Sequence, residues 1–223
     1  MSSAGKVHKI DFGRLIVVPF FTFFVVFSLS TVWRDARALS PVNTIKCLVL
    51  MHHVLSVCFC ALIIFLYFIR RPAILTGRSF VTNSIAIVAS FGPFFTLLFL
   101  GKPSLTTQGM LLVADLIITI GMVLSIYSIY SLGKSFSIIP QARKLVQSGP
   151  YRLVRHPIYL GELISIFGVI LTGLTIPKLI MYLLLIGCQV YRALQEEKLL
   201  AGVFPQEYEE YSSRTARFIP GII

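Results

Sequence analysis

Six long apolar runs constrain this chain more than any other feature of its sequence. A helix that crosses the hydrocarbon core of a bilayer needs about 20 mostly apolar residues. Backbone polar groups in lipid must be satisfied within their own segment, so such runs form helices. The sequence therefore predicts an all-α, polytopic membrane bundle of about six transmembrane helices. The runs are Leu15–Trp33, Ile45–Ile69, Phe80–Leu100, Met110–Leu132, Ile158–Thr175 and Pro177–Leu194.

The composition agrees with a membrane protein and argues against a nucleic-acid-binding one. Hydrophobic residues make up 56% of the chain and charged residues 13%, whereas a soluble domain carries about 25% charged residues. The net charge is +11, but its cations lie in short loops. With the N-terminus inside, the inner segments hold 15 Lys and Arg and the outer loops 5. The positive-inside rule then predicts that both termini are cytoplasmic, in a bacterial cytoplasmic membrane or the endoplasmic reticulum.

We expect one integral membrane domain over residues 1–223, built in two parts. Residues 1–132 hold four helices, and residues 133–223 hold a loop, a helical hairpin and a C-terminal segment. The four cysteines lie in or beside apolar runs without a CxxC pair, which favours small hydrophobic packing roles over a disulfide framework. We expect no metal site, because the adjacent residues His52 and His53 point to different sides of a helix.

Polar residues gather in the stretch GPYRLVRHPIYLGEL, residues 149–163, at the start of the fifth run. Pro157 suits the first position of a helix, where its missing N–H costs nothing. The helix would begin with unpaired N–H groups and a positive dipole end, which together favour an anion. Arg152 and Arg155 add positive charge, so this stretch predicts an anion site at the membrane surface.

Folding the last two runs back on each other at about Ile176 predicts which residues share a depth. At 1.5 Å per residue, His156 lies level with Glu196, and residue 160 lies level with Arg192. Arg192 and Glu196 are four residues apart and share one helix face. The pattern indicates a site for a small charged ligand. Snorkelling arginines and a solvated ion pair are the alternative.

Three stretches, taken together and in order, resemble the isoprenylcysteine carboxyl methyltransferase family of integral membrane methyltransferases. They are LVQSGPYRLVRHPIYLG at 145–161, RALQEEKLL at 192–200 and FPQEYEEYSSRTARFIPGI at 204–222. The resemblance implies an enzyme that uses S-adenosylmethionine as methyl donor. It also implies a cytoplasmic cofactor pocket formed by the last hairpin, the loop before it and the C-terminal segment. The acceptor would be a lipophilic carboxylate, thiol or amine that enters from the bilayer.

The resemblance also implies which residues form the site. Arg192 is expected to orient the acceptor, and Glu196 to bind the cofactor; we treat both as catalytic. If the acceptor is a thiol or an amine, Glu196 or His156 could serve as the base. The expected cofactor-binding residues are Gln141, Arg143, Lys144, Leu145, Val146, Tyr151, His156, Pro157, Ile158, Tyr159, Glu196 and Glu197.

Other functions stay open at this point. Membrane sterol reductases, which bind NADPH, share a related C-terminal region with an RHxNYxGD-like element, where this chain has RHPIYLGE. Phospholipid N-methyltransferases share the architecture but usually carry Asn where His156 stands, which disfavours a phosphatidylethanolamine acceptor. A non-catalytic membrane protein would bind no cofactor. The sequence assigns no role to Asp115 or Glu162, and it reveals neither the acceptor nor the oligomeric state.

Overall fold

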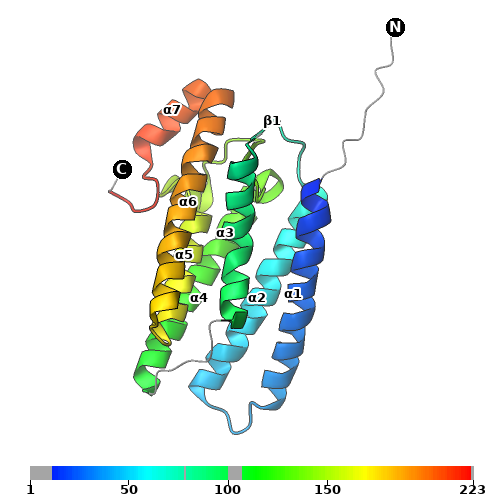
Figure 1. The fold of residues 1–223 in the computed structure, drawn as a ribbon, viewed down its shortest axis with the longest axis vertical. Coiled ribbons are helices and arrows are strands. Elements are labelled where there is room, and N and C mark those ends of the chain that lie inside the picture. Colours follow the sequence, from blue (N-terminus) through cyan, green and yellow to red (C-terminus); the bar gives the residue numbers. More distant parts are fainter. Residues whose placement is uncertain (1–11, 78, 100–106, 222–223) are drawn as a thin grey trace.

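Each of the six apolar runs forms a helix in the computed structural model, which describes residues 12–77, 79–99 and 107–221 (Figure 1). The predicted end of the third run, Leu100, lies outside the described residues. A seventh helix, α7, follows the hairpin, so the all-α prediction is confirmed. The helices are α1 (Phe12–Arg37), α2 (Thr44–Ile69), α3 (Phe80–Phe99), α4 (Gln108–Leu132), α5 (Pro157–Leu171), α6 (Ile176–Val203) and α7 (Pro205–Arg214).

Within the described residues, four helices are long and apolar enough to cross a membrane: α1, α2, α4 and α6. Helix α3 has 20 residues, with an apolar stretch at Phe80–Gly92, and α5 is shorter, with 15 residues. At 1.5 Å per residue, α5 spans about 22 Å and α6, with 28 residues, about 42 Å. Because the two helices share the turn at 172–175, the C-terminal end of α6 extends past the first residue of α5.

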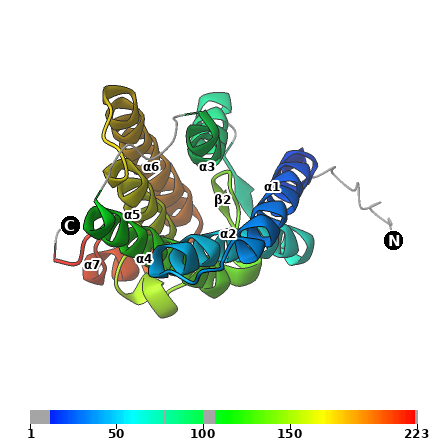
Figure 2. The same cartoon turned by 90° about the horizontal axis from the view of Figure 1, so that it is seen from below.

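The helices follow one another around the bundle in the order α1, α2, α4, α5, α6 and α3 (Figure 2). Aromatic side chains join α1 to α3, with the Phe20 and Phe91 rings stacked at 4.1 Å and the Phe21 and Phe91 rings edge to face at 5.8 Å. Phe21 and Phe91 belong to the buried apolar cluster that fills the interior. Side chains from both halves of the chain therefore share one core.

Small residues bring α4 and α5 closer together than ordinary side chains would allow. A Cβ atom placed on Gly161 of α5 would lie 2.4 Å from Ser125 Oγ and 2.7 Å from the carbonyl oxygen of Gly121 on α4. Small residues at such positions let two membrane helices pack backbone against backbone. This contact fixes the first turns of α5 against α4.

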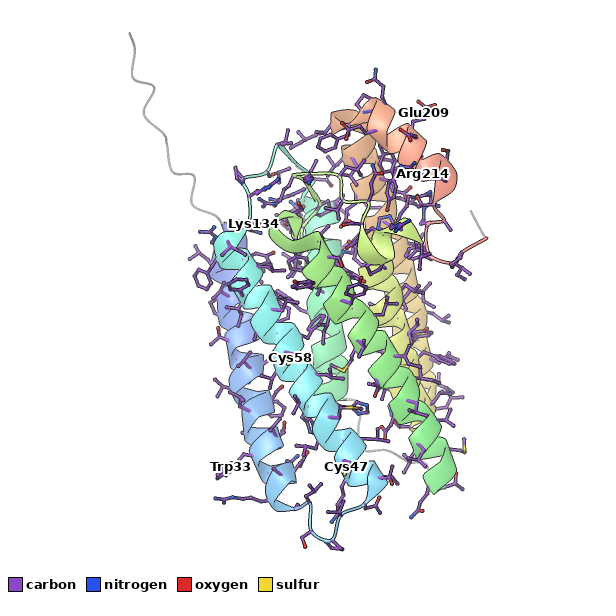
Figure 3. The ribbon with its side chains drawn as sticks, turned by 180° about the vertical axis from the view of Figure 1, so that it is seen from behind. Trp33, Cys47, Cys58, Lys134, Glu209 and Arg214 are labelled. Carbon is purple, nitrogen blue, oxygen red and sulfur yellow. The ribbon has the colours of Figure 1, made fainter. Side chains whose placement is uncertain are left out.

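The two ends of the bundle carry different polar residues. Lys134, Glu209 and Arg214 lie at one end, which we call the α7 end, and Trp33 and Cys47 lie near the other (Figure 3). Two short strands, β1 (Leu75–Thr76) and β2 (Gln141–Ala142), pair antiparallel at the α7 end. This pairing joins the loop after α2 to the loop before α5.

The adjacent histidines of α2 contact two different helices, as helix geometry predicts. His52 Nε2 lies 3.0 Å from the carbonyl oxygen of Asp115 and 2.9 Å from Thr119 Oγ1, both on α4. His53 Nδ1 lies 2.7 Å from Asp35 Oδ2 on α1. Within the described ranges, no group of three or more His, Cys, Asp or Glu side chains is arranged to hold a metal ion. These histidines therefore link α2 to its neighbours.

Candidate functional site

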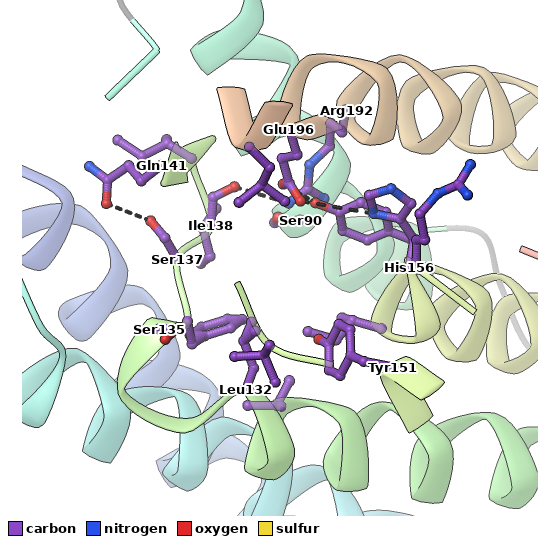
Figure 4. A pocket seen from close by; sticks show the side chains of 18 of the residues that line it. Ser90, Leu132, Ser135, Ser137, Ile138, Gln141, Tyr151, His156, Arg192 and Glu196 are labelled. Carbon is purple, nitrogen blue, oxygen red and sulfur yellow. Dashed lines mark hydrogen bonds and ion pairs between the residues drawn. The ribbon is translucent and has the colours of Figure 1, made fainter. Parts of the chain in front are cut away.

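A cavity of about 110 Å³ lies at the α7 end, between the helices and the 133–156 segment (Figure 4). The cavity is lined by most of the residues that the sequence selected. These are Gln141, Lys144, Leu145, Val146, Tyr151, His156, Ile158, Tyr159, Arg192 and Glu196. The other three selected residues, Arg143, Pro157 and Glu197, are outside the lining.

The start of α5 meets the end of α6 at the depth that the hairpin predicts. The Tyr159 hydroxyl donates a hydrogen bond to Glu196 Oε1, and His156 Nδ1 lies 4.0 Å from Glu196 Oε2. The rings of His156 and Tyr159 stack nearly parallel, with centroids 5.4 Å apart. Two aromatic rings and one carboxylate therefore converge on the cavity from two helices.

Glu197, the neighbour of Glu196, points to a different set of partners. Its carboxylate accepts hydrogen bonds from Arg155 Nε at 3.1 Å and from Arg217 Nε and Nη2 at 3.0 and 2.9 Å, and it lies 3.1 Å from His156 Nε2. The bond from Arg217 to Glu197 raises the pKa of the guanidinium above its ordinary value. Arg155, which we expected to add charge to an anion site, is paired with this carboxylate. Glu197 thus joins α5, α6 and the C-terminal segment.

The C-terminal segment is also held by the backbone that precedes α5. The N–H groups of Arg155 and His156 donate to the carbonyl oxygens of Ala216 and Arg217 at 2.8 and 3.1 Å. The two segments therefore run side by side as a short parallel bridge. His156 is 6% exposed, and this pairing sets the position of its ring.

Helix α7 covers the loop side of the cavity. Leu145 packs in a cluster with Tyr208 and Tyr211, and the Tyr211 hydroxyl donates to the carbonyl oxygen of Tyr151 at 2.8 Å. Burial raises the pKa of Tyr211 to about 12, so its phenol stays protonated and keeps donating at neutral pH. Tyr151 is therefore held in the cavity wall by a residue that the sequence did not single out.

Arg192 is buried in the wall between α5 and α6, with 3% of its surface exposed. Its Nη1 donates to Gln189 Oε1 and its Nη2 to the carbonyl oxygen of Ile138, both at 3.0 Å. The guanidinium lies 4.5 Å from the centre of the Tyr159 ring. Its Nε has no hydrogen-bond partner among the described residues. Gln189 in turn donates to Glu162 Oε2, and Glu162 lines the cavity.

The loop before α5 is held by residues from the first half of the chain. The N–H of Ile138 donates to the Tyr67 hydroxyl of α2 at 3.1 Å. The Gln141 side chain accepts a hydrogen bond from Arg143 and donates to Thr76 Oγ1 at 3.3 Å. Gln141 and Arg143 thus bind each other as well as forming part of the loop.

An apolar wall closes the membrane side of the cavity, and sequence reasoning did not find it. It consists of Phe21 of α1, Phe59 and Ile63 of α2, and Ile129 of α4, with the hydroxyl-bearing Ser90 of α3 beside them. These residues sit in uniformly apolar runs, where periodicity does not separate the cavity face from the lipid face. Their role follows only from how the four helices pack.

Residues 109–207 match the sequence model of the phospholipid methyltransferase family. The resemblance to membrane methyltransferases is confirmed for this part of the chain. The matched range begins in α4 and ends in α7, so it holds the α5–α6 hairpin and the loop before it. The apolar wall residues of α1, α2 and α3 lie before it.

A second comparison finds a curated relative over a shorter stretch. Over 79 residues the chain is 39% identical to the cobalt-zinc-cadmium resistance protein CzcN of Cupriavidus metallidurans. The aligned stretch covers 34% of this chain and 35% of that protein. The chain thus spans about a third of the length of this relative.

Proposed function

We propose that this membrane protein is an S-adenosylmethionine-dependent methyltransferase that acts on a lipophilic acceptor at the cytoplasmic membrane face. One observation carries the proposal. His156, Tyr159 and Glu196 converge on a cavity within the range that matches the methyltransferase family. The polar end of this cavity continues into an apolar wall, which suits an acceptor with a hydrocarbon part.

The groups around the cavity fit the chemistry of S-adenosylmethionine. Glu196 is a carboxylate at the cavity wall, which suits an ammonium group or ribose hydroxyls. The first turn of α5 offers N–H groups without partners inside the helix, which suit a carboxylate. Leu145 and Val146 give an apolar surface for an adenine ring. These groups therefore suit the amino-acid end, the ribose and the adenine ring of the cofactor.

The bound cofactor would supply a methyl group already activated on a sulfonium. The chain's own residues then have to position the acceptor and exclude water. Arg192 lines the cavity beside the Tyr159 ring, and we propose that it orients the reacting group of the acceptor. Phe21, Phe59 and Ile63 exclude water on the membrane side. Tyr159 and His156 hold the Glu196 carboxylate in place.

The cytoplasmic assignment rests on charge. The start of α1 and the end of α2 lie at the same end of the bundle as α7 (Figure 1). The segments expected at that end hold 15 of the 20 Lys and Arg of the chain. The positive-inside rule places such an end in the cytoplasm, where S-adenosylmethionine is made.

Calorimetric titration of the purified protein with S-adenosylhomocysteine tests the proposal. We expect the wild type to bind and Glu196→Gln to bind at least about tenfold more weakly, since a hydrogen bond to a charged group contributes about 1.5–3 kcal/mol. Glu209→Gln, on the exposed side of α7, is the matched control and should bind as the wild type does. Absence of binding by folded wild type, or binding of NADPH instead, would contradict the assignment.

A further inference from the structure

We infer that Glu162 is the base that takes a proton from the methyl acceptor, and that the acceptor is therefore a proton-bearing nucleophile, a thiol or an amine, rather than a carboxylate. The inference rests on the proposed function and deepens it. It depends on four side chains, Glu162, Gln189, Arg192 and Glu196, and on how their charges balance in the cavity wall.

The two bases that the sequence suggested are already engaged. His156 Nε2 lies 3.1 Å from Glu197, and the same ring faces Glu196 through its Nδ1 at 4.0 Å. Glu196 accepts the hydrogen bond of the Tyr159 hydroxyl. Both groups are held at the polar, cofactor-side end of the cavity. A base for the acceptor is needed nearer the apolar wall, where a hydrocarbon chain would lie.

Glu162 lies deeper along α5 than His156 and Tyr159 do. It lies five residues after Pro157, more than one turn into α5, and its side chain lines the cavity. Oε2 is fixed by the hydrogen bond from Gln189, a side chain with 0% exposure. Oε1 has no hydrogen-bond partner within the part of the chain that the structure describes. Gln189 therefore holds one carboxylate oxygen, and the other has no hydrogen-bond partner among the described residues, on a side chain that lines the cavity.

The Gln189 side-chain amide also bridges the Glu162 carboxylate and the Arg192 guanidinium. Its Oε1 accepts from Arg192 Nη1 at 3.0 Å, and its Nε2 donates to Glu162. The amide thus stands between guanidinium and carboxylate. Arg192 keeps a buried Nε without a partner among the described residues, and Glu162 keeps a free oxygen. Each of the two charged groups therefore keeps one polar atom without a hydrogen-bond partner among the described residues.

The charges of this wall do not favour a carboxylate acceptor. Arg192 contributes one positive charge, which Glu162 balances through Gln189, and Glu196 adds a negative charge nearby. Among the other cationic lining residues, Arg155 and His156 contact Glu197, and Lys144 is exposed at the loop side. A carboxylate here would add a further buried anion beside Glu162 and Glu196, with no protein cation left to pair with it, which is costly. A neutral thiol or an ammonium group avoids that cost.

The proposed step involves only the acceptor, the Glu162 carboxylate and the sulfonium of the cofactor. The S–H proton of a thiol acceptor, or one N–H proton of the ammonium form of an amine acceptor, passes to the Glu162 carboxylate. The freed lone pair of sulfur or nitrogen forms a bond to the methyl carbon, while the bond from that carbon to the sulfonium breaks. The electron pair of the broken bond stays on the sulfur of the departing S-adenosylhomocysteine. Gln189 positions the Glu162 carboxylate through its hydrogen bond, and it also holds Arg192, which lines the same cavity.

Three single-chain amphiphiles of equal length test the inference: dodecanethiol, dodecylamine and dodecanoate. Purified full-length protein in lipid nanodiscs would receive each probe with methyl-labelled S-adenosylmethionine. We expect label on the thiol or the amine and none on dodecanoate. Glu162→Gln keeps the shape of the side chain and a partner for Gln189. We expect it to lower that transfer by about 100-fold or more, the range of general base catalysis.

Binding of S-adenosylhomocysteine separates this inference from the proposed function. Glu162→Gln should bind it like the wild type, and the Glu209→Gln control should match the wild type in both assays. Labelled dodecanoate, transfer by Glu162→Gln within a few-fold of wild type, or binding without transfer to any of the three probes would each overturn the inference alone. Failure of the wild type to bind would overturn the proposed function and the inference with it.

Discussion

Replacing Glu197 by glutamine is expected to loosen the C-terminal segment and to lower the free energy of unfolding by about 3 kcal/mol. The carboxylate is within 3.1 Å of side-chain nitrogens of Arg155, His156 and Arg217. The Arg155 side chain is only 6% exposed. Removal of its counter-charge leaves a buried cation facing a neutral amide, which is why the expected cost exceeds that of a surface ion pair.

Thermal unfolding in detergent, with the rate of tryptic cleavage at Arg214 and Arg217, measures this effect. Glu197→Gln should melt at a lower temperature and be cut faster, whereas Glu209→Gln should behave as the wild type does. Binding of S-adenosylhomocysteine should also weaken, because the segment that holds His156 is displaced. Unchanged melting and cleavage would show that Glu197 does not join these segments.

Replacing Gly161 by alanine is expected to destabilise the bundle by about 3 kcal/mol, the upper part of the range for overpacking. The new Cβ would lie 2.4 Å from Ser125 Oγ and within 3 Å of two backbone atoms of α4, the carbonyl oxygen of Gly121 and the N–H nitrogen of Ser125. Backbone atoms cannot rotate away, so α4 and α5 must separate. This displacement also moves His156 and Tyr159 relative to the loop that precedes α5.

Gly187→Ala provides the matched control for this change. Gly187 lies in α6, and a Cβ atom there would have no heavy atom within 4 Å. Its substitution should leave the melting temperature unchanged or raise it slightly, since alanine favours helix more than glycine does. Comparison of the two melting temperatures in the same detergent isolates the helix contact. Equal effects would contradict close packing at Gly161.

The helices could be predicted from sequence because apolar length alone requires them. All six runs form helices near the expected bounds, and Pro157 begins α5 as expected for a first helical position. The length of α5 could not be predicted, because the run 158–175 continues through Thr172 and Gly173 into the turn. The order of the helices around the bundle could not be predicted either. It depends on contacts between distant residues, such as Gly121 and Gly161, which the sequence does not indicate.

The hairpin part of the site could be predicted because helix rise is constant. Equal counts from the turn placed His156 beside Glu196, and both line the cavity. The different partners of Glu196 and Glu197 could not be predicted, because adjacent carboxylates on a helix differ only in the helix face that they occupy. Tyr67 holds the loop before α5, and Phe21 lines the cavity. Both contacts join residues more than 70 positions apart, and no local sequence pattern indicates them.

Transfer of a labelled methyl group tests the central claim most directly. Membranes that contain the protein would be incubated with methyl-labelled S-adenosylmethionine, and the lipid-extractable fraction would then be counted. The proposal predicts label in this fraction for the wild type and the Glu209→Gln control, and at least about tenfold less for Glu196→Gln. Equal label in membranes with and without the protein, or in wild type and Glu196→Gln, would contradict it.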